Sequence, residues 1–500
     1  MDEIKTLILS NEDWNSLYRV PANVKLLCDE KSEEIERNLY DVTIIDRRMT
    51  HKELNELYKS TKAYCVFFTD KVEINEAHKR FMESRKGKLL ATDKIQDFFD
   101  NDIRNYFPKP YGEKYKPMDI IISGEFTGEK KWLGYTGVEL CGEFGEDFTQ
   151  IVYWKGNIPI FAGQNLDMYL EYSKSESVSV KFCVSVYKAG AIAELMEHYE
   201  FDEEQLKDYI NIDNGDAMCW LYVYIMASGH GTLTIRGLHD RHARRGIGHF
   251  LPGGETYRTS SGEEIFCYFD PADMKPPLNI YFSGFKTQEG FEGYYLLKNM
   301  GCPFLLVAEG RLQGGCFYMG DDEYEKLMVE VIKKYVDELG FSNDQVIMSG
   351  LSMGTTGAMY YSVDIRPKSV IIGKPLASIG DIAAASLRSR PGDFATSMDV
   401  LYKITGGMDE KSVEKLNSKF WDKFKQGDFS DTKFVVAYMI EDDYDTTAYG
   451  KLLDNLNSVG ASIYGKGLHG RHNDNSNGIV YWFSDRYKHV MYDDYKRIMK

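Results

Sequence analysis

The 500-residue sequence lacks the features that would place it in a membrane or secreted class. No apolar run approaches the roughly 18 residues that a membrane-spanning helix needs. The first residues, MDEIKTLILSNEDW, have neither the basic segment nor the long apolar run of a secretory signal. The eight cysteines are scattered, without the paired spacing of a zinc site or a small disulfide framework. We therefore expect a cytoplasmic protein with reduced thiols and no integral membrane segment.

Positive charge is also scarce. The chain carries 60 Lys and Arg against 77 Asp and Glu, a formal net charge of −17, and no basic block runs along it. Tight binding to a phosphate backbone would have to overcome this long-range repulsion, so nucleic acid is not expected as a partner. No glycine-rich phosphate loop follows an apolar run in the first region of the chain, and the sequence therefore gives no support for a bound nucleotide cofactor.

The pattern of apolar and polar residues along the chain predicts an α/β protein with three regions. Residues 1–112 alternate apolar β-type runs with amphipathic stretches, which predicts a small α/β domain with a docking or structural role. Residues 117–237 consist mainly of short aromatic and β-branched segments, typical of a β-sandwich, with helical patterning only near 192–210. The aromatic residues of the sandwich fit either core packing or glycan binding.

A segment rich in histidine and arginine follows the expected sandwich. Residues 238–264 begin LHDRHARRGIGHFLPGGE, and we predict that they form a linker or loop. His239, His242 and His249 could hold a metal only in an unusual loop, because no carboxylate or cysteine ligands cluster with them. A hinge or an anion-contacting loop is the better interpretation, and no metal site is expected.

Residues 265–500 again alternate strand and helix patterns, which predicts a doubly wound, α/β-hydrolase-like catalytic domain. Between the strand-like runs SVIIG and KFVVAYMI lies a stretch of more than 50 residues. Such a stretch is too long for an ordinary connection. We therefore expect residues 376–431 to be a lid insertion over the ends of the strands.

The stretch QVIMSGLSMGTTGAMYY contains the candidate nucleophile, Ser352. A Gly-x-Ser-x-Gly pattern alone is weak in a chain with 44 glycines. Here an apolar β-type run precedes it and a helix-compatible run follows, which is the context of a nucleophile elbow. A serine hydroxyl still needs a histidine base that is oriented by a carboxylate.

Both partners occur later in the chain, in the order that α/β-hydrolases use. The run KFVVAYMI ends in the acidic cluster EDDYD, where Asp442 is our choice as the acid, with Glu441 and Asp443 as alternatives. The loop KGLHGRHNDNSNG then carries His469 and His472, and we favour His472 as the base. A solvated acidic loop would explain several of these carboxylates even in an active enzyme.

Acyl transfer also needs hydrogen-bond donors for the developing oxyanion. The residue after the nucleophile, Met353, would present its backbone N–H. Phe285, just after the run NIYFSG, could present a second backbone N–H. No cofactor is expected to be bound, and no coenzyme A motif is recognisable. The acyl donor stays open, with acetyl-CoA as a candidate.

The amino-acid sequence of several segments resembles that of the second of the Asp factors, the accessory secretory proteins of the bacterial accessory Sec system. These segments are TIRGLHDRHARRGIGHFLPGG, IYFSGFKTQEGFEG, GLSMGTTGAMYYSVDIRPKSVIIGKPL, YMIEDDYD and HGRHND. The resemblance implies a protein of the Gram-positive cytoplasm that acts beside an accessory SecA-type ATPase and other Asp factors. It would reach the membrane only through the translocation machinery. Its role would be the export of serine-rich-repeat glycoprotein adhesins.

The same resemblance implies an acyl-transfer activity, the O-acetylation of N-acetylglucosamine on the adhesin by a Ser-acid-His triad. The nucleophile carries over to Ser352 and the base to His472, whereas the acid within IEDDYD is uncertain by one residue. Two other interpretations remain. The chain could be a non-catalytic export factor that binds the adhesin and the motor, or a plain carbohydrate esterase.

Overall fold

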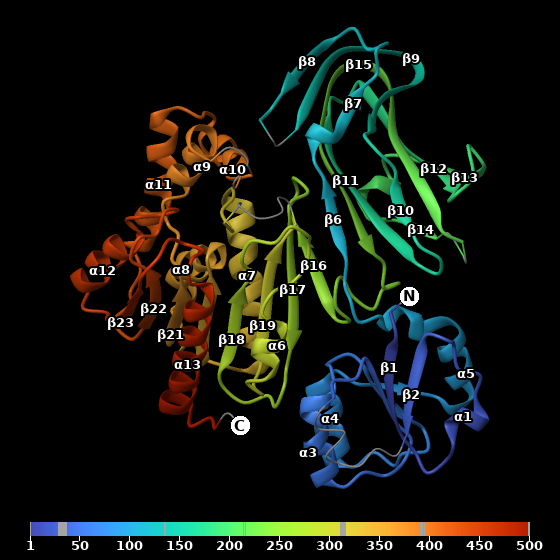
Figure 1. Cartoon of the computed structure of the whole chain (residues 1–500), viewed down its shortest axis with the longest axis vertical. Helices are drawn as coiled ribbons and strands as arrows, with labels where there is room; N and C mark the ends of the chain where they lie inside the picture. The colour runs from blue at the N-terminus through green and yellow to red at the C-terminus, as the bar shows by residue number, and fades with distance from the viewer. Residues whose placement is uncertain are drawn as a thin grey trace. The chain divides into compact units, whose positions relative to one another are not determined.

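The computed structural model describes residues 2–28, 38–134, 137–213, 215, 217–310, 317–390, 394 and 396–498. The chain is a mixed α/β protein with several sheets, as the sequence predicts (Figure 1). It divides into two compact units. One unit is Pro110–Gly246, and the other combines Asp2–Lys109 with Ile247–Lys500.

The N-terminal segment contains a parallel sheet with the strand order β2-β1-β3-β4-β5. The apolar β-branched runs of the sequence form these strands, and β3 and β4 are buried along their whole length, as parallel strands between helices must be. The strands are β1 (Ile4–Leu9), β2 (Val24–Cys28), β3 (Val42–Ile45), β4 (Val66–Thr69) and β5 (Lys88–Leu90). The α-helices are α1 (Trp14–Leu17), α3 (His51–Ser60), α4 (Glu76–Arg85) and α5 (Ile95–Asp97).

Buried charges join this segment to the C-terminal one. Arg85, at the end of α4, donates to Asp270 at 2.8 Å, and both side chains are almost fully buried. Lys298 lies 3.7 Å from the other carboxylate oxygen of Asp270 and donates to the Thr61 carbonyl at 2.5 Å. Buried charges are stable only when they are paired. These contacts therefore tie the two segments into one unit.

The other unit is built around two long strands, β9 (Val138–Trp154) and β15 (Cys219–His242). The first half of β15 pairs with β12 and its second half with β11, so the sheet folds around one apolar core. Gly229 lies where β15 changes partners, and a Cβ there would lie 2.1 Å from the Ser177 carbonyl oxygen. The shorter strands are β6 (Gly112–Tyr115), β7 (Ile120–Ile122), β8 (Glu129–Trp132), β10 (Ile158–Ile160), β11 (Asn165–Lys174), β12 (Val178–Lys188), β13 (Leu195–Phe201) and β14 (Ile210–Asp213).

One prediction about this region is wrong, and another holds only in part. The helical pattern near 192–210 is strand β13, a short 3₁₀ turn and the start of β14, because β13 pairs with β12. The predicted 238–264 linker does contain the boundary between the two units, Gly246–Ile247, but it also includes the end of β15, all of β16 and the first residue of β17. His239 lies in the sheet opposite Tyr169, with its Nε2 3.1 Å from Glu171, so its polarity reflects a buried pair and not an exposed loop.

The C-terminal segment contains an eight-stranded sheet in the described residues, with the order β16-β17-β19-β18-β20-β21-β22-β23. From β19 to β23 the strands are parallel, whereas β16 and β17 are antiparallel to their neighbours. The ends of β20, β21 and β22 therefore meet at one edge. The strands are β16 (Gly254–Arg258), β17 (Glu264–Asp270), β18 (Leu278–Phe282), β19 (Phe304–Glu309), β20 (Val346–Leu351), β21 (Ser369–Gly373), β22 (Lys433–Met439) and β23 (Ser462–Leu468).

Helices cover both faces of this sheet (Figure 1). Helix α8 packs on β18, β20 and β21, and α13 packs on β21 and β22 from the other face. The helices outside the long insertion are α6 (Tyr294–Lys298), α7 (Asp322–Leu339), α8 (Met353–Ile365), α12 (Ala448–Ser458) and α13 (Ser476–Tyr495). In the described part of the chain, no helix combines the length and apolar character needed to cross a membrane.

The stretch 376–431, expected as a lid insertion, is largely helical. Its helices are α9 (Ile379–Arg388), α10 (Ser397–Thr405) and α11 (Glu410–Phe424). Helix α9 packs against both α10 and α11, so the helices of the insertion pack on one another, and α11 also packs on α8. Residues 391–393 and 395 of this stretch lie outside the described residues.

Candidate active site

Ser352 lies on a tight turn between β20 and α8. Its backbone is in an unusual conformation for a non-glycine residue, with φ 53° and ψ −120°. The glycines two positions away make the turn possible, because a Cβ at Gly354 would lie 2.0 Å from the Phe282 carbonyl oxygen and one at Gly350 would lie 2.4 Å from that of Gly354. Such backbone strain costs about 1–3 kcal/mol and is concentrated at functional sites. The Gly-x-Ser-x-Gly pattern is therefore a steric requirement here.

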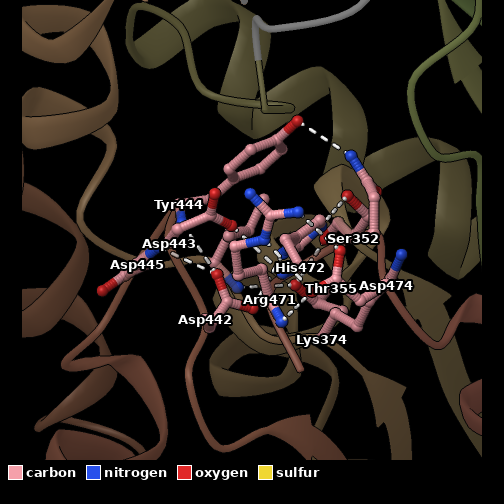
Figure 2. A network of polar contacts seen from close by, with 12 residues as sticks. Ser352, Thr355, Lys374, Asp442, Asp443, Tyr444, Asp445, Arg471, His472 and Asp474 are labelled. Carbon is pink, nitrogen blue, oxygen red and sulfur yellow. Dashed lines mark hydrogen bonds and ion pairs between the residues drawn. The ribbon is translucent and has the colours of Figure 1, made fainter. Parts of the chain in front are cut away.

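Two side chains join Ser352 in a continuous relay (Figure 2). The Ser352 Oγ lies 2.9 Å from Nε2 of His472, and Nδ1 of His472 lies 2.8 Å from Oδ2 of Asp442. The side chains of His472 and Asp442 are 1% and 8% exposed. Because an ionised carboxylate only accepts hydrogen bonds, Nδ1 donates to Asp442, and Nε2 is left to accept the serine proton.

The other acids of the cluster have different partners. Glu441 contacts the ring of the exposed His469 and accepts from the Gly470 N–H at 2.6 Å. Asp443 accepts from the backbone N–H of His472 at 3.1 Å and pairs with Arg390. Of the three acids considered from sequence, Asp442 is therefore the one that contacts the His472 ring.

Both rejected acids are held ionised by their neighbours. Burial alone would raise the pKa of Asp443, but the His472 N–H and the Arg390 guanidinium hold it below its usual range. The Gly470 N–H and His469 lower the pKa of the exposed Glu441. These two carboxylates thus order the loop that carries His472 without touching its ring nitrogens.

The two expected oxyanion donors belong to the turn of the nucleophile and to the loop after β18. Met353 is the first residue of α8, directly after Ser352, and Phe285 follows Gly284 in the loop after β18. Gly284 and Met353 line the same pocket. The Gly284 N–H donates to Glu292 at 2.7 Å, which fixes the loop just before Phe285.

Aromatic side chains that the sequence does not single out enclose the relay. The Tyr444 ring stacks on His472, with a centroid distance of 4.2 Å and an interplanar angle of 12°. Arg390 lies over the Tyr444 ring, 4.4 Å from its centroid. Phe394 contacts Tyr444 at a centroid distance of 5.1 Å and Phe285 at 5.6 Å. The long insertion thus reaches the histidine through Arg390 and Phe394.

The start of the insertion is anchored to the acidic cluster. Asp445 accepts from the backbone N–H groups of Ala377 and Ser378, at 2.9 and 2.6 Å. This carboxylate has no contact with His472 in the described residues. One short turn after β22 therefore supports both the base and the insertion.

One group of potential metal ligands occurs in the described residues, and it lies in the other unit. Ligand atoms of Cys183, His198 and Glu200 lie within 4.8 Å of one another. Glu200 is already paired with Lys181 at 2.8 Å, and burial raises the pKa of the Cys183 thiol to about 11. The neighbouring ammonium would repel a divalent cation, so we assign no metal to this group.

Comparisons with known proteins agree over almost the whole chain. The family model described as Asp2, accessory Sec system GspB-transporter, matches residues 4–497. Accessory Sec system protein Asp2 of Streptococcus gordonii is 34% identical over 99% of each chain. The protein of that name from Staphylococcus aureus (strain NCTC 8325 / PS 47) is 36% identical over 86% of this chain and 80% of its own.

A solved structure agrees as well. A chain of the glycosylation associate protein (Gap123) complex from Streptococcus agalactiae superimposes with a TM-score of 0.85. That chain is 33% identical to this one, over 99% of each. The full-length matches in sequence and structure lead to one conclusion: this chain belongs to the Asp2 family of the accessory Sec system.

Proposed function

We propose that this protein is a serine acyltransferase of the accessory Sec system, acting on a glycoprotein that the system exports. The observation that carries the proposal is the unbroken relay from Ser352 through His472 to Asp442, with hydrogen-bond distances of 2.9 and 2.8 Å. The strained backbone of Ser352 supports it, because the turn aims the hydroxyl at the histidine.

In the first half of the reaction, His472 Nε2 takes the Ser352 proton while Oγ attacks the acyl carbonyl carbon of the donor. The carbonyl electron pair moves to the oxygen, which the N–H groups of Met353 and Phe285 stabilise. The tetrahedral intermediate then collapses and expels the donor's leaving group, which takes the proton from His472. Asp442 stabilises the imidazolium throughout. The product is an ester on Ser352.

In the second half, a sugar hydroxyl replaces the leaving group. His472 removes its proton, the alkoxide oxygen attacks the Ser352 ester, and Oγ leaves with the proton returned by His472. A transferase must favour this hydroxyl over water. The insertion supports that preference, because Phe394 and Arg390 pack on Tyr444 beside the base. We assign residues 376–431 the role of the lid.

Family membership supports the choice of acceptor and partners in this proposal. We propose N-acetylglucosamine on a serine-rich-repeat adhesin as the acceptor and acetyl as the transferred group, with acetyl-CoA as the candidate donor. The partners are the other accessory secretory proteins and the accessory SecA-type ATPase. A full-length relative in the Gap123 complex of Streptococcus agalactiae supports assembly with other Asp factors. The protein would work in the cytoplasm, at the membrane only through that machinery.

The test of the chemistry is covalent labelling. A fluorophosphonate probe should add once to the native protein, not to Ser352→Ala, and much more slowly to His472→Ala, as read by intact mass. The matched control is His469→Ala, which removes the other histidine of the same loop and should label like the native protein. A folded native protein that does not label, alone or with its partner Asp factors, would contradict the proposed nucleophile.

The two alternative functions give different outcomes in cells. With Ser352→Ala, we expect loss of acetyl groups from the adhesin glycan and retention of much of the export. Unchanged acetylation would favour a non-catalytic export factor that binds the adhesin and the motor. Labelling of Ser352 together with release of free acetate, and no acetylated sugar, would instead favour a plain carbohydrate esterase.

A further inference from the structure

Ser352 is both the proposed nucleophile and the N-cap residue of α8. A serine at an N-cap ordinarily has an extended backbone, and its Oγ accepts from the second or third N–H group of the helix. In the described residues Ser352 does neither: its φ is 53°, its Oγ caps no N–H group of α8, and that Oγ lies 2.9 Å from His472. Other contacts must therefore hold this serine out of the capping conformation.

The backbone of Ser352 is held at both of its polar groups by residues 373–376. Its N–H donates to the Gly373 carbonyl at 2.8 Å. Its carbonyl accepts from the Thr355 hydroxyl at 2.6 Å, and that hydroxyl accepts from the Leu376 N–H at 3.0 Å. A hydroxyl has a single proton, so the bond from Leu376 leaves that proton for the Ser352 carbonyl.

The Thr355 side chain is well placed to act on the nucleophile. Thr355 is fully buried and belongs to the polar network around the relay (Figure 2). The segment that orients its hydroxyl is fixed in turn, because Asp445 accepts from the N–H groups of Ala377 and Ser378, the two residues after Leu376. The start of the insertion therefore connects the turn of the nucleophile to the turn of the acid.

We propose that Thr355 is a positioning residue that prevents Ser352 from capping its own helix and so keeps Oγ directed at His472. The Thr355 N–H is the third of α8, a group that a capping Oγ would accept from, but it donates to the Ser352 carbonyl at 3.0 Å. The Thr355 hydroxyl fixes the same carbonyl and so opposes a return to an extended backbone. Such strain persists only where surrounding contacts enforce it. The inference rests on the proposed function, since it assigns a role within that site.

The experiment is the rate of fluorophosphonate labelling in variants that differ by one hydroxyl. Thr355→Val replaces the hydroxyl with a methyl group and removes its contacts with Ser352 and Leu376. We expect labelling of Ser352 to be slower by about 10- to 100-fold, because small misplacements of a reacting group have effects of that size. Thr355→Ser keeps the hydroxyl and should restore most of the native rate.

Thr356 supplies the matched control. It is the next residue of α8, it is also fully buried, and its hydroxyl donates to the Leu376 carbonyl at 2.7 Å. Thr356→Val therefore removes a buried hydrogen bond to the same residue but leaves both contacts of the Ser352 carbonyl in place. It should lower the urea midpoint about as much as Thr355→Val does, and it should label at nearly the native rate.

A folded Thr355→Val protein that labels at the native rate would overturn the proposal. Equal slowing of Thr355→Val and Thr356→Val would also overturn it, because that pattern indicates a purely structural role. If the native protein does not label at all, the proposed function fails separately.

Hydrogen–deuterium exchange of the Ser352 N–H, read by mass spectrometry, then tests the inference without any activity. Thr355→Val leaves the Gly373 acceptor of this N–H in place, yet it should accelerate the exchange by about tenfold, because the turn is free to relax. Thr356→Val should leave the exchange unchanged. Equal exchange rates in the two variants would refute the role of Thr355.

Discussion

Replacement of Asp442 by asparagine should abolish most of the nucleophilicity of Ser352, and the geometry dictates how. Oδ1 of Asp442 accepts from the backbone N–H groups of Tyr444 and Asp445, at 2.9 and 3.2 Å. The amide oxygen of an asparagine would keep those two donors, which turns its NH₂ toward Nδ1 of His472. Nδ1 would then accept a hydrogen bond instead of donating one. The proton of the neutral ring would move to Nε2, which faces Ser352.

A histidine in that tautomer cannot take the serine proton. The wrong tautomer costs about 10⁴-fold in a comparable triad, which corresponds to about 5 kcal/mol of transition-state stabilisation. The assay is the second-order rate constant of fluorophosphonate labelling at about pH 7.5, read by intact mass. Asp442→Asn should react about 10⁴-fold more slowly than the native protein.

The neighbouring acids supply the controls. Glu441→Gln should label at nearly the native rate, because among the described residues Glu441 contacts only the exposed His469 and the Gly470 N–H. Asp443→Asn keeps an acceptor for the His472 backbone and should lose less than about tenfold. If Asp442→Asn labels within about tenfold of the native protein while either control is severely slowed, the assignment of the acid is wrong.

Three further predictions follow from contacts elsewhere. Phe394→Ala removes the ring that contacts Phe285 and Tyr444. Released acetate should therefore rise about fivefold relative to acetylated sugar, with Ser352 labelling preserved. An unchanged ratio of acetate to acetylated sugar would show that this ring does not exclude water. Arg85→Met leaves Asp270 buried without the Arg85 guanidinium, and should lower the free energy of unfolding by about 3–5 kcal/mol in urea denaturation. Adding Asp270→Asn to this variant should recover part of the loss. An unchanged urea midpoint for Arg85→Met would contradict this prediction. Burial alone would raise the pKa of Glu171, but Lys114 and His239 hold it at about 2, below the ordinary 4.5. Its contribution to stability should be complete above about pH 4.5 and be lost as the pH falls toward 2, and Glu171→Gln should flatten the acid limb of a tryptophan-fluorescence unfolding profile.

The sequence predicts the order of the relay because each of its parts has a recognisable local sequence pattern. The nucleophile turn needs small residues at fixed offsets, and Gly350 and Gly354 supply them. The acid and the histidine follow successive strands of a parallel sheet, whose ends meet at one edge. A pattern of strands and turns is therefore enough to bring Ser352 and His472 to the same place.

The choice among the acids was not determined by the sequence. Glu441, Asp442, Asp443 and Asp445 all follow one strand, and any of them could reach a histidine in an extended chain. The turn decides between them: Asp442 receives two backbone N–H groups through Oδ1, which aims Oδ2 at the imidazole. Asp445 is turned toward the insertion instead. Backbone hydrogen bonds of this kind leave no distinctive pattern in a row of carboxylates.

The errors in the other unit have one physical origin. In β13, Leu195, Met196 and Tyr199 fit a helical spacing, but pairing along β12 overrides that preference. At the end of β15, His239 and Arg241 look like loop residues in the sequence. In the structure, His239 pairs with the buried Glu171, and Arg241 donates to the Tyr209 hydroxyl. Long-range pairing decided both cases, and the partners are far away in the chain.

The same reasoning changes how the N-terminal segment must be tested. A docking role suggests deleting residues 1–112 and measuring export. However, Arg85 and the Thr61 carbonyl both lie in that segment, and they satisfy Asp270 and Lys298 of the C-terminal segment. Deletion would remove the partners of Asp270 and Lys298 and would expose a new surface beside β17, a strand of the sheet that carries Ser352. A loss of export after deletion would therefore measure folding as much as docking. Only substitutions at exposed positions of α3 and α4 that leave Arg85 in place can separate the two.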